Sequence, residues 1–285
     1  MDWDLQTVDD VLLETELSGY EECIVDGLIS STVTTIAGDT CAGKTHLAID
    51  AARSLLTGAP FLGRSVARTL DRVAFLCGEP GGRLSVARRS KAAGVDGRRL
   101  VVMSFYMPES RQDCKDAVSV FRRDRIGAVI VDGITTGIPG GIRDPRDVKM
   151  VLDGLRLWSD NGAAILSLHH DSQMGGCFES ALWRKWTRIE LKLSGSPGSS
   201  RCRLQSVGGD AEPVNFSLVF DPAEAPAFKF AGERVRPERP DTTAGRNAEI
   251  AAYVTAGHSW RDAERHFGVS HGKVSRAMEA MRRVA

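Results

Sequence analysis

Short apolar segments alternate with amphipathic ones along the first two-thirds of the chain. The apolar segments are rich in Val, Ile, Leu and Ala, as expected of strands buried on both faces of a parallel sheet. They span residues 32–37, 72–77, 100–104, 128–132 and 163–169. The stretches between them are compatible with helices and include 44–56, 82–93, 112–124 and 147–161. Strands alternating with helices predict an α/β fold with a doubly wound, mostly parallel sheet.

The pattern changes after Arg188. Two apolar segments, 188–193 and 202–207, flank a Gly-Ser-Pro-Gly turn, and a third follows at 214–220. This arrangement predicts an antiparallel extension at one edge of the sheet. Residues 234–243 are rich in Pro and charge, which is typical of a linker. We therefore expect an acidic N-terminal arm (1–21), a main α/β domain (22–232), a linker (233–244) and a small all-α module (245–285).

The composition is that of an ordinary globular protein. Hydrophobic residues make up 42% of the chain and charged residues 26%, which argues against a disordered, collagen-like or coiled-coil protein. No apolar run approaches the roughly 20 residues that cross a bilayer, and the N-terminus lacks the basic start of a secretory signal. We expect a cytoplasmic protein without a membrane partner. The six cysteines are not spaced as in a zinc or redox site, so we predict reduced thiols.

Charge is unevenly distributed, although the formal net charge is zero. The first 26 residues contain nine acidic and no basic side chains, whereas 245–285 contains seven basic and four acidic ones. An acidic arm is usually solvated surface; docking onto a basic partner or a neighbouring subunit is the alternative. Zero net charge gives no global indication of nucleic-acid binding.

A phosphate-binding motif lies between the first strand and the first helix. The sequence GDTCAGKT at 38–45 satisfies G-x-x-x-x-G-K-[ST], and its strand and helix flanks argue against a chance match. The glycines let the backbone turn so that N–H groups face phosphates. We expect Lys44 to reach the β- and γ-phosphates of ATP and Thr45 to bind Mg²⁺. The predicted nucleotide-binding residues are Gly38, Asp39, Thr40, Cys41, Ala42, Gly43, Lys44, Thr45 and His46.

The ends of three further strands carry side chains suited to ATP hydrolysis. Asp132 is predicted to organise Mg²⁺ together with Thr45. Glu79 is the candidate for orienting the attacking water. His170, rather than His169, is the candidate sensor of the γ-phosphate. The ordinary alternatives are a strand-end Asp, a turn Glu and a surface His.

Taken in this order, the P-loop and the three strand-end residues resemble the RecA-like ATPases of plasmids and phages, which include hexameric replicative helicases. Residues 24–28 (IVDGL) also resemble the entry segment of that family, and the resemblance covers about 22–221. It implies a RecA fold that binds ATP and Mg²⁺, with Glu79 as the catalytic carboxylate, Asp132 as the second metal residue and His170 as a sensor. It further implies action on DNA and assembly into a homo-oligomer, commonly a ring.

The sequence departs from the family's pattern in two places. The strand after the hairpin usually carries a basic pair that reaches the neighbouring subunit's nucleotide, but 204–210 has no basic residue, and Arg201 and Arg203 lie just upstream. The loop at 171–179, where family members contact DNA, contains no Lys or Arg. Ring-coupled hydrolysis is therefore left open by the sequence.

The last segment predicts three short helices. The first spans 246–255, Ser259 caps a second, and a sharp turn at Gly268 precedes a third. Residues 259–270 resemble the helix-turn-helix of resolvase-type and transposase-type DNA binders, although Glu264 stands where a small residue is usual. That resemblance implies a third helix that enters the major groove, whereas the alternative is a protein-docking cap. The predicted DNA-contacting residues are His271, Lys273, Ser275 and Arg276.

Two functions are compatible with these features. The first is an ATP-hydrolysing motor that acts on DNA, like a replicative helicase of a plasmid or phage. The second is an ATP-switched regulator that binds duplex DNA through its helical module without unwinding it. The RecA-like pattern favours the first function, and the helix-turn-helix pattern favours the second.

Overall fold

A computed structural model describes most of the chain. The chain divides into two compact units, Met1–Arg234 and Val235–Ala285. The described residues are 7–18, 22–105, 110–134, 145–170, 186–196, 198–209, 213–233 and 242–284. The predicted loop at 171–179 and most of the predicted linker lie outside them.

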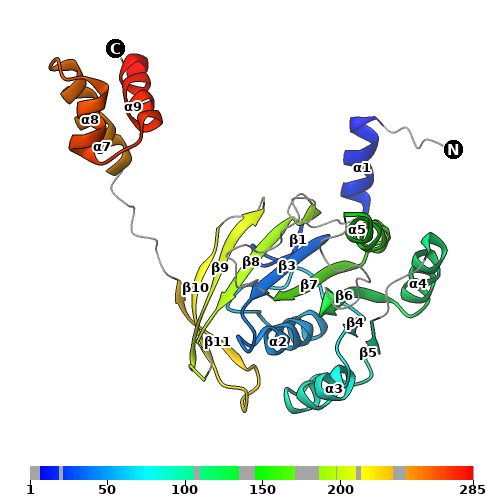
Figure 1. The fold of residues 1–285 in the computed structure, drawn as a ribbon. Coiled ribbons are helices and arrows are strands. Elements are labelled where there is room, and N and C mark those ends of the chain that lie inside the picture. Colours follow the sequence, from blue (N-terminus) through cyan, green and yellow to red (C-terminus); the bar gives the residue numbers. More distant parts are fainter. Residues whose placement is uncertain are drawn as a thin grey trace. The chain divides into compact units, whose positions relative to one another are not determined.

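A mixed β-sheet forms the centre of the larger unit (Figure 1). Among the described residues it has nine strands in the order β11-β10-β9-β8-β3-β7-β6-β4-β5. The strands are β3 (Val33–Gly38), β4 (Arg72–Cys77), β5 (Leu100–Ser104), β6 (Ile126–Asp132), β7 (Ala164–His170), β8 (Ile189–Ser194), β9 (Arg201–Gly209), β10 (Asn215–Phe220) and β11 (Phe228–Glu233). Neighbouring strands from β8 to β5 are parallel, and those from β8 to β11 are antiparallel. The predicted α/β fold, with its antiparallel extension, is confirmed.

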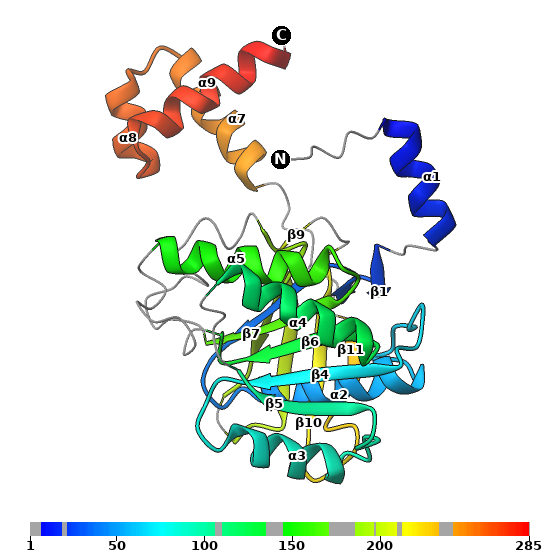
Figure 2. The ribbon, with the colours of Figure 1, turned by 90° about the vertical axis from the view of Figure 1, so that its right-hand side faces the viewer.

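Helices cover both faces of the parallel strands (Figure 2). Helices α2 and α3 lie on one face, and α4 and α5 lie on the other. Their bounds are Lys44–Thr57, Gly82–Ala92, Arg111–Arg123 and Pro145–Ser159. Strand β4 shows why two faces are needed, because Phe75 packs in the core under α2 while its neighbour Leu76 packs in the core under α4 and α5. Both side chains are buried, as successive residues of a strand point to opposite faces.

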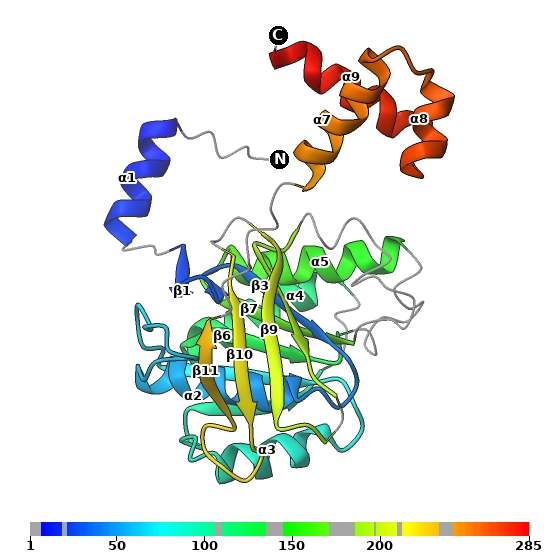
Figure 3. The same cartoon turned by 90° about the vertical axis from the view of Figure 1, so that its left-hand side faces the viewer.

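Four elements were not predicted from the sequence, namely α1 (Val8–Ser18), β1 (Cys23–Val25), β2 (Ile29–Ser30) and β11. Helix α1 begins at a capping box, in which Thr7 and Asp10 exchange side-chain and backbone hydrogen bonds. The hairpin β1–β2 turns at Gly27, whose φ is 65°. Strand β11 pairs antiparallel with β10 and ends the sheet on that side (Figure 3).

A buried aspartate joins α2 to the beginning of β11. The Asp50 carboxylate accepts hydrogen bonds from the backbone N–H groups of Ala227 and Phe228, at 3.1 and 2.9 Å. Its side chain lies in the core, and this burial raises the pKa of the Asp50 carboxyl. The link fixes the antiparallel extension against the helix that follows the P-loop.

Replacing Asp50 with Ala should lower the free energy of unfolding by about 2–4 kcal/mol, because two buried N–H groups lose their acceptor. Chemical denaturation of both proteins measures the difference. Asp50→Asn keeps one carbonyl acceptor and should cost less, whereas an equal loss in both variants would contradict this assignment.

The smaller unit consists of three helices around a compact core. These are α7 (Thr242–Thr255), α8 (Trp260–Phe267) and α9 (His271–Val284). Ser259 forms a capping box with Asp262, and Gly268 has the left-handed conformation expected of a tight turn. The core residues are Ile250, Ala263, Val274 and Ala277. The three predicted helices are confirmed, but α7 already begins inside the segment that we expected to be linker.

Five of the six cysteines lie in the described part of the chain. Cys23, Cys41, Cys77, Cys114 and Cys202 are free thiols, as predicted, and Cys177 lies outside the described residues. Burial raises the pKa of the Cys77 thiol to about 11.

Within the described ranges, no helix has the length and apolar character needed to span a membrane.

Candidate nucleotide-binding site

The P-loop connects β3 to α2 and is tightly enclosed. A Cβ atom on Gly38 would lie 2.3 Å from the carbonyl oxygen of Leu193 in the adjacent strand β8. Gly43 has a φ of 93°, and a Cβ there would lie 2.9 Å from the ring of Phe228. Only glycine satisfies both constraints without displacing neighbouring atoms. The loop therefore has a fixed path, with its last residues leading into the N-terminus of α2.

Lys44 folds back over this loop. Its Nζ donates hydrogen bonds to the carbonyl oxygens of Gly38 and Asp39, at 2.8 and 2.9 Å. The side chain is only 6% exposed, so these acceptors compensate the cost of burying its charge. The ammonium group is thus held at the loop, where an incoming phosphate group can replace the carbonyl acceptors.

A hydroxyl and a carboxylate meet beside the loop. Thr45, in the first turn of α2, donates a hydrogen bond of 2.8 Å from Oγ1 to Oδ2 of Asp132 at the end of β6. Burial raises the pKa of the Asp132 carboxyl, and the bond from Thr45 partly opposes that rise. Both oxygens are hard ligands of the kind that Mg²⁺ prefers. They fit an Mg²⁺ ion that takes its remaining ligands from phosphate and water.

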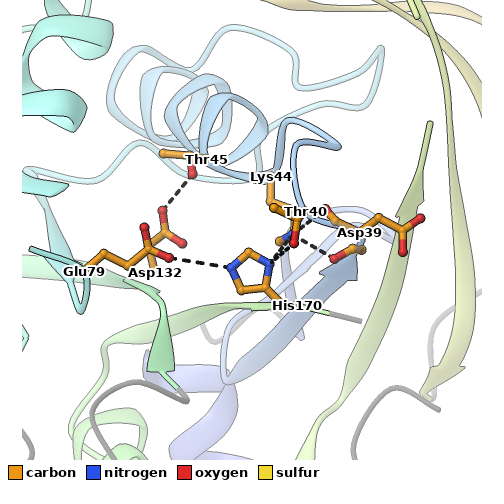
Figure 4. A network of polar contacts seen from close by, with 8 residues as sticks. Asp39, Thr40, Lys44, Thr45, Glu79, Asp132 and His170 are labelled. Carbon is orange, nitrogen blue, oxygen red and sulfur yellow. Dashed lines mark hydrogen bonds and ion pairs between the residues drawn. The ribbon is translucent and has the colours of Figure 1, made fainter. Parts of the chain in front are cut away.

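His170 at the end of β7 lies between Lys44 and Glu79 (Figure 4). Its Nδ1 is 3.3 Å from Nζ of Lys44, and its Nε2 is 3.7 Å from Oε1 of Glu79. Because an ammonium group only donates, Nδ1 must accept, which places the imidazole proton on Nε2 facing the carboxylate. This histidine therefore links the lysine of the P-loop motif to the carboxylate that follows β4.

Sheet topology explains how these residues come together. Strands β3, β7, β6 and β4 are neighbours in that order, and the carboxyl ends of parallel strands meet at one edge of a sheet. The structure thus brings Lys44, Thr45, Asp132, Glu79 and His170 to one edge. Among the described residues, no group of three or more His, Cys, Asp or Glu side chains forms a metal cage.

The other predicted residues have more varied surroundings. Thr40 Oγ1 lies 3.5 Å from Nδ1 of His170, at the outer limit of a hydrogen bond. His46 packs edge-on against Phe220 of β10, with ring centroids 5.4 Å apart, and burial lowers its pKa. His169 is buried behind the site, where its Nε2 lies 3.2 Å from Oγ of Ser167. Of the two histidines, His170 is the one whose ring nitrogen is placed 3.3 Å from Nζ of Lys44.

Sequence reasoning missed the residues that enclose the P-loop from the antiparallel side. Phe220 and Phe228 stack with their centroids 4.6 Å apart, and both lie within 3.4 Å of a Cβ placed on Gly43. Leu193 encloses Gly38 in the same way. No local sequence signal marks these contacts, because each depends on the pairing of distant strands.

The predicted DNA-contacting residues lie along the first turns of α9. His271 and Arg276 are exposed, and Lys273 and Ser275 are partly exposed. Nδ1 of His271 lies 2.7 Å from Oε1 of Glu264, so the unusual Glu264 connects α8 to the start of α9. In the larger unit, Arg203 bonds Asn215 of β10 through its Nε at 2.8 Å.

A sequence profile described as an AAA domain matches residues 4–176, which is more than half of the chain. The match includes the P-loop and the three strand ends that carry Glu79, Asp132 and His170. The chain therefore belongs to this AAA domain family, a family of P-loop ATPases. A comparison with curated proteins gave no match.

Proposed function

We propose that the chain binds ATP with Mg²⁺ and hydrolyses it at the edge where the P-loop meets β4, β6 and β7. The observation that carries the proposal is the contact series from Thr45 and Asp132 through Lys44 and His170 to Glu79. Each member has a chemical type that phosphoryl transfer requires, and the site combines a cation, a pair of candidate metal ligands and an exposed carboxylate.

In this proposal, the P-loop and Lys44 bind the phosphates. The Lys44 ammonium exchanges the carbonyls of Gly38 and Asp39 for oxygens of the β- and γ-phosphates, and the loop's N–H groups add hydrogen bonds. Thr45 and Asp132 hold Mg²⁺, which, when bound, offsets the negative charge of the phosphates. The raised pKa of Asp132 would fall when it binds a cation, since an adjacent positive charge favours the carboxylate.

Glu79 and His170 act on the other side of the γ-phosphate. Glu79 is exposed and accepts a proton from the attacking water, which orients that water for in-line attack. His170 contacts both the lysine and the carboxylate, so loss of the γ-phosphate changes its hydrogen-bond partners. This gives the chain a means of detecting hydrolysis.

The base and ribose of the nucleotide fit a cavity on the side of the P-loop that borders β9 and β10. It has a volume of about 410 Å³ and is lined by residues that include Cys41, Phe220, Asp221 and the turn around Gly195. Phe220 offers an aromatic surface, and Asp221 offers an acceptor for an amino or hydroxyl group. The nucleotide would then lie across the loop, with its phosphates directed towards Asp132.

We further propose that ATP hydrolysis is coupled to DNA, as in a helicase-like motor. The support comes from the α/β fold with its P-loop and from a three-helix unit whose α9 carries the exposed Arg276 and the partly exposed Lys273. The alternative is an ATP-switched regulator that binds duplex DNA without unwinding it. The helix-turn-helix pattern of α8 and α9, with the capping box at Ser259 and the turn at Gly268, favours this alternative.

DNA binding by the smaller unit should depend on Arg276. We expect Arg276→Ala to weaken DNA binding about 5- to 150-fold, a loss of about 1–3 kcal/mol, and Glu249→Ala, on α7, to leave it unchanged. Binding by the unmodified chain should weaken with salt, at a log–log slope of roughly −0.9 per phosphate neutralised. Fluorescence anisotropy at several salt concentrations measures both quantities, and a flat salt dependence would instead indicate a protein-docking unit.

Two assays separate the motor from the switch. The ATPase rate is measured with no DNA, with single-stranded DNA and with duplex DNA, and strand displacement is measured beside a footprint on duplex DNA. Unwinding with sequence-independent binding supports the motor. A discrete footprint without unwinding supports the switch.

A further inference from the structure

Helix α3 carries a strongly basic surface beside the last strand of the sheet. The helix contains four basic residues and no acidic one. The basic residues are Arg83, Arg88, Arg89 and Lys91, and all four are exposed. Within the described ranges, none of these side chains forms an ion pair. Their charge is therefore available to an anionic partner.

An apolar groove lies between α3 and the edge strand β5 (Figure 2). It has a volume of about 750 Å³, and its lining includes Leu84 and Val102 as well as Arg83. Leu84 is 57% exposed even though it is apolar. Residues four and seven apart share one face of a helix, so Arg88 and Lys91 continue the face that Leu84 presents. The groove thus combines an apolar lining with a basic rim.

We propose that this α3–β5 groove binds a single strand of nucleic acid, with the phosphates along α3 and the bases against the apolar lining. Proteins that bind single strands combine positive charge for the backbone with apolar surface for the bases. A duplex pairs and stacks its bases inside the helix, so it would use the charge of α3 but not the apolar lining. The combination of the two therefore favours a single strand.

The spacing of the basic residues suits a chain of phosphates. A helix rises about 1.5 Å per residue, so Arg83 and Lys91 are about 12 Å apart along the axis of α3. Successive phosphates of one strand are about 3.4 Å apart along the axis of a stacked helix, so Arg83, Arg88 and Lys91 can each contact a different phosphate. Arg89 is not part of this row, because it lines a separate small cavity together with His46 of α2.

The groove adjoins the proposed catalytic site. Glu79 and the Pro80–Gly81 turn also line it, and the N–H of Gly82 closes this turn by donating a 3.0 Å hydrogen bond to the Glu79 carbonyl oxygen. Gly82 is the first residue of α3, so the basic helix begins at the turn that holds Glu79. A strand bound along α3 would therefore influence the position of Glu79. This last step rests on the proposed ATP hydrolysis, whereas the binding of the strand does not.

A double charge reversal, Arg88→Glu with Lys91→Glu, tests the groove in the full-length chain. Fluorescence anisotropy with labelled oligothymidylate should show that the variant binds about tenfold more weakly or worse, because two charge-assisted contacts are lost. The log–log dependence of affinity on salt should become shallower by about 1.4, since each phosphate contact on a single strand contributes about 0.7. The same titration with oligouridylate shows whether RNA or DNA is the preferred strand.

A matched control and a second variant keep the result interpretable. Lys115→Glu with Arg122→Glu, on α4, makes the same change of net charge at two exposed residues and should leave the affinity and the salt slope unchanged. Leu84→Ala removes apolar surface but no charge, so it should weaken binding about threefold without changing the slope. Circular dichroism of each variant reports the fold.

Oligothymidylate binding is measured without ATP, so its result does not depend on hydrolysis. A chain that bound the strand through α3 but hydrolysed no ATP would support the groove and overturn only the proposed function. Equal losses in the α3 and α4 variants, or no loss in either, would overturn the groove. A loss caused by Arg276→Ala instead would assign the strand to the smaller unit. An unmodified chain that bound no oligothymidylate at low salt would also overturn the groove, and would favour an acidic protein segment as its occupant.

Discussion

Replacing Lys44 with Ala should abolish ATP hydrolysis and weaken ATP binding about 10- to 100-fold. The side chain is the one cation held by the P-loop carbonyls in the described structure, and a charge-assisted hydrogen bond contributes about 1.5–3 kcal/mol. Titration with a fluorescent ATP analogue measures the binding, and phosphate release measures the hydrolysis.

The matched control for this variant is Lys149→Ala. Lys149 is exposed on α5 and pairs with Asp153 one helical turn away, so its loss should leave both quantities unchanged. If Lys44→Ala bound ATP as tightly as the unmodified chain, the phosphates could not lie in this loop.

Glu79→Gln should retain ATP while losing about 10²–10⁴ of the hydrolysis rate. An amide of the same shape still fits the turn after β4 but cannot accept a proton from water, and general bases contribute about that much to catalysis. Because Glu79 is not part of the P-loop that we propose to bind the phosphates, the affinity for ATP should change by less than about threefold. A single-turnover measurement with bound ATP separates the chemical step from binding.

Strand β4 offers a matched control for Glu79 at its other end. Asp71 precedes β4, is exposed and pairs with Arg125 at 3.6 Å. Asp71→Asn should hydrolyse ATP at the unmodified rate. If Glu79→Gln reduced binding and turnover equally, the division of roles between Glu79 and Lys44 would be wrong.

Much of the fold could be predicted because the strands are buried on both faces. Burial makes their sequences nearly continuously apolar, as in β6, and the amphipathic helices between them are equally distinct. Helix α1 and strand β11 were missed for different reasons. The apolar residues of α1 are exposed, so they give no core-facing pattern. In β11 only the first residue, Phe228, is buried, so the strand has no alternating pattern to recognise.

The sequence could predict which residues form the candidate site, but not the contacts that they make. The P-loop motif and the order of the strands suffice to bring Asp132 and His170 near Lys44, since parallel strands end at one edge. That Lys44 folds back to Gly38 and that Phe228 encloses Gly43 depend on tertiary packing. Sequence position alone does not encode either contact.

The antiparallel extension has a consequence for where the protein can be cut. The family match stops at residue 176, but Gly38 lies against Leu193, Gly43 lies against Phe228, and Asp50 holds the start of β11. An expression fragment that stopped at the end of the match would lack β8, which pairs with β3. It would also lack Phe220 and Phe228, the aromatic residues that lie against Gly43 of the P-loop. The shortest fragment that keeps every contact around the P-loop therefore extends to Glu233, the end of β11, well beyond the residues that the profile matches.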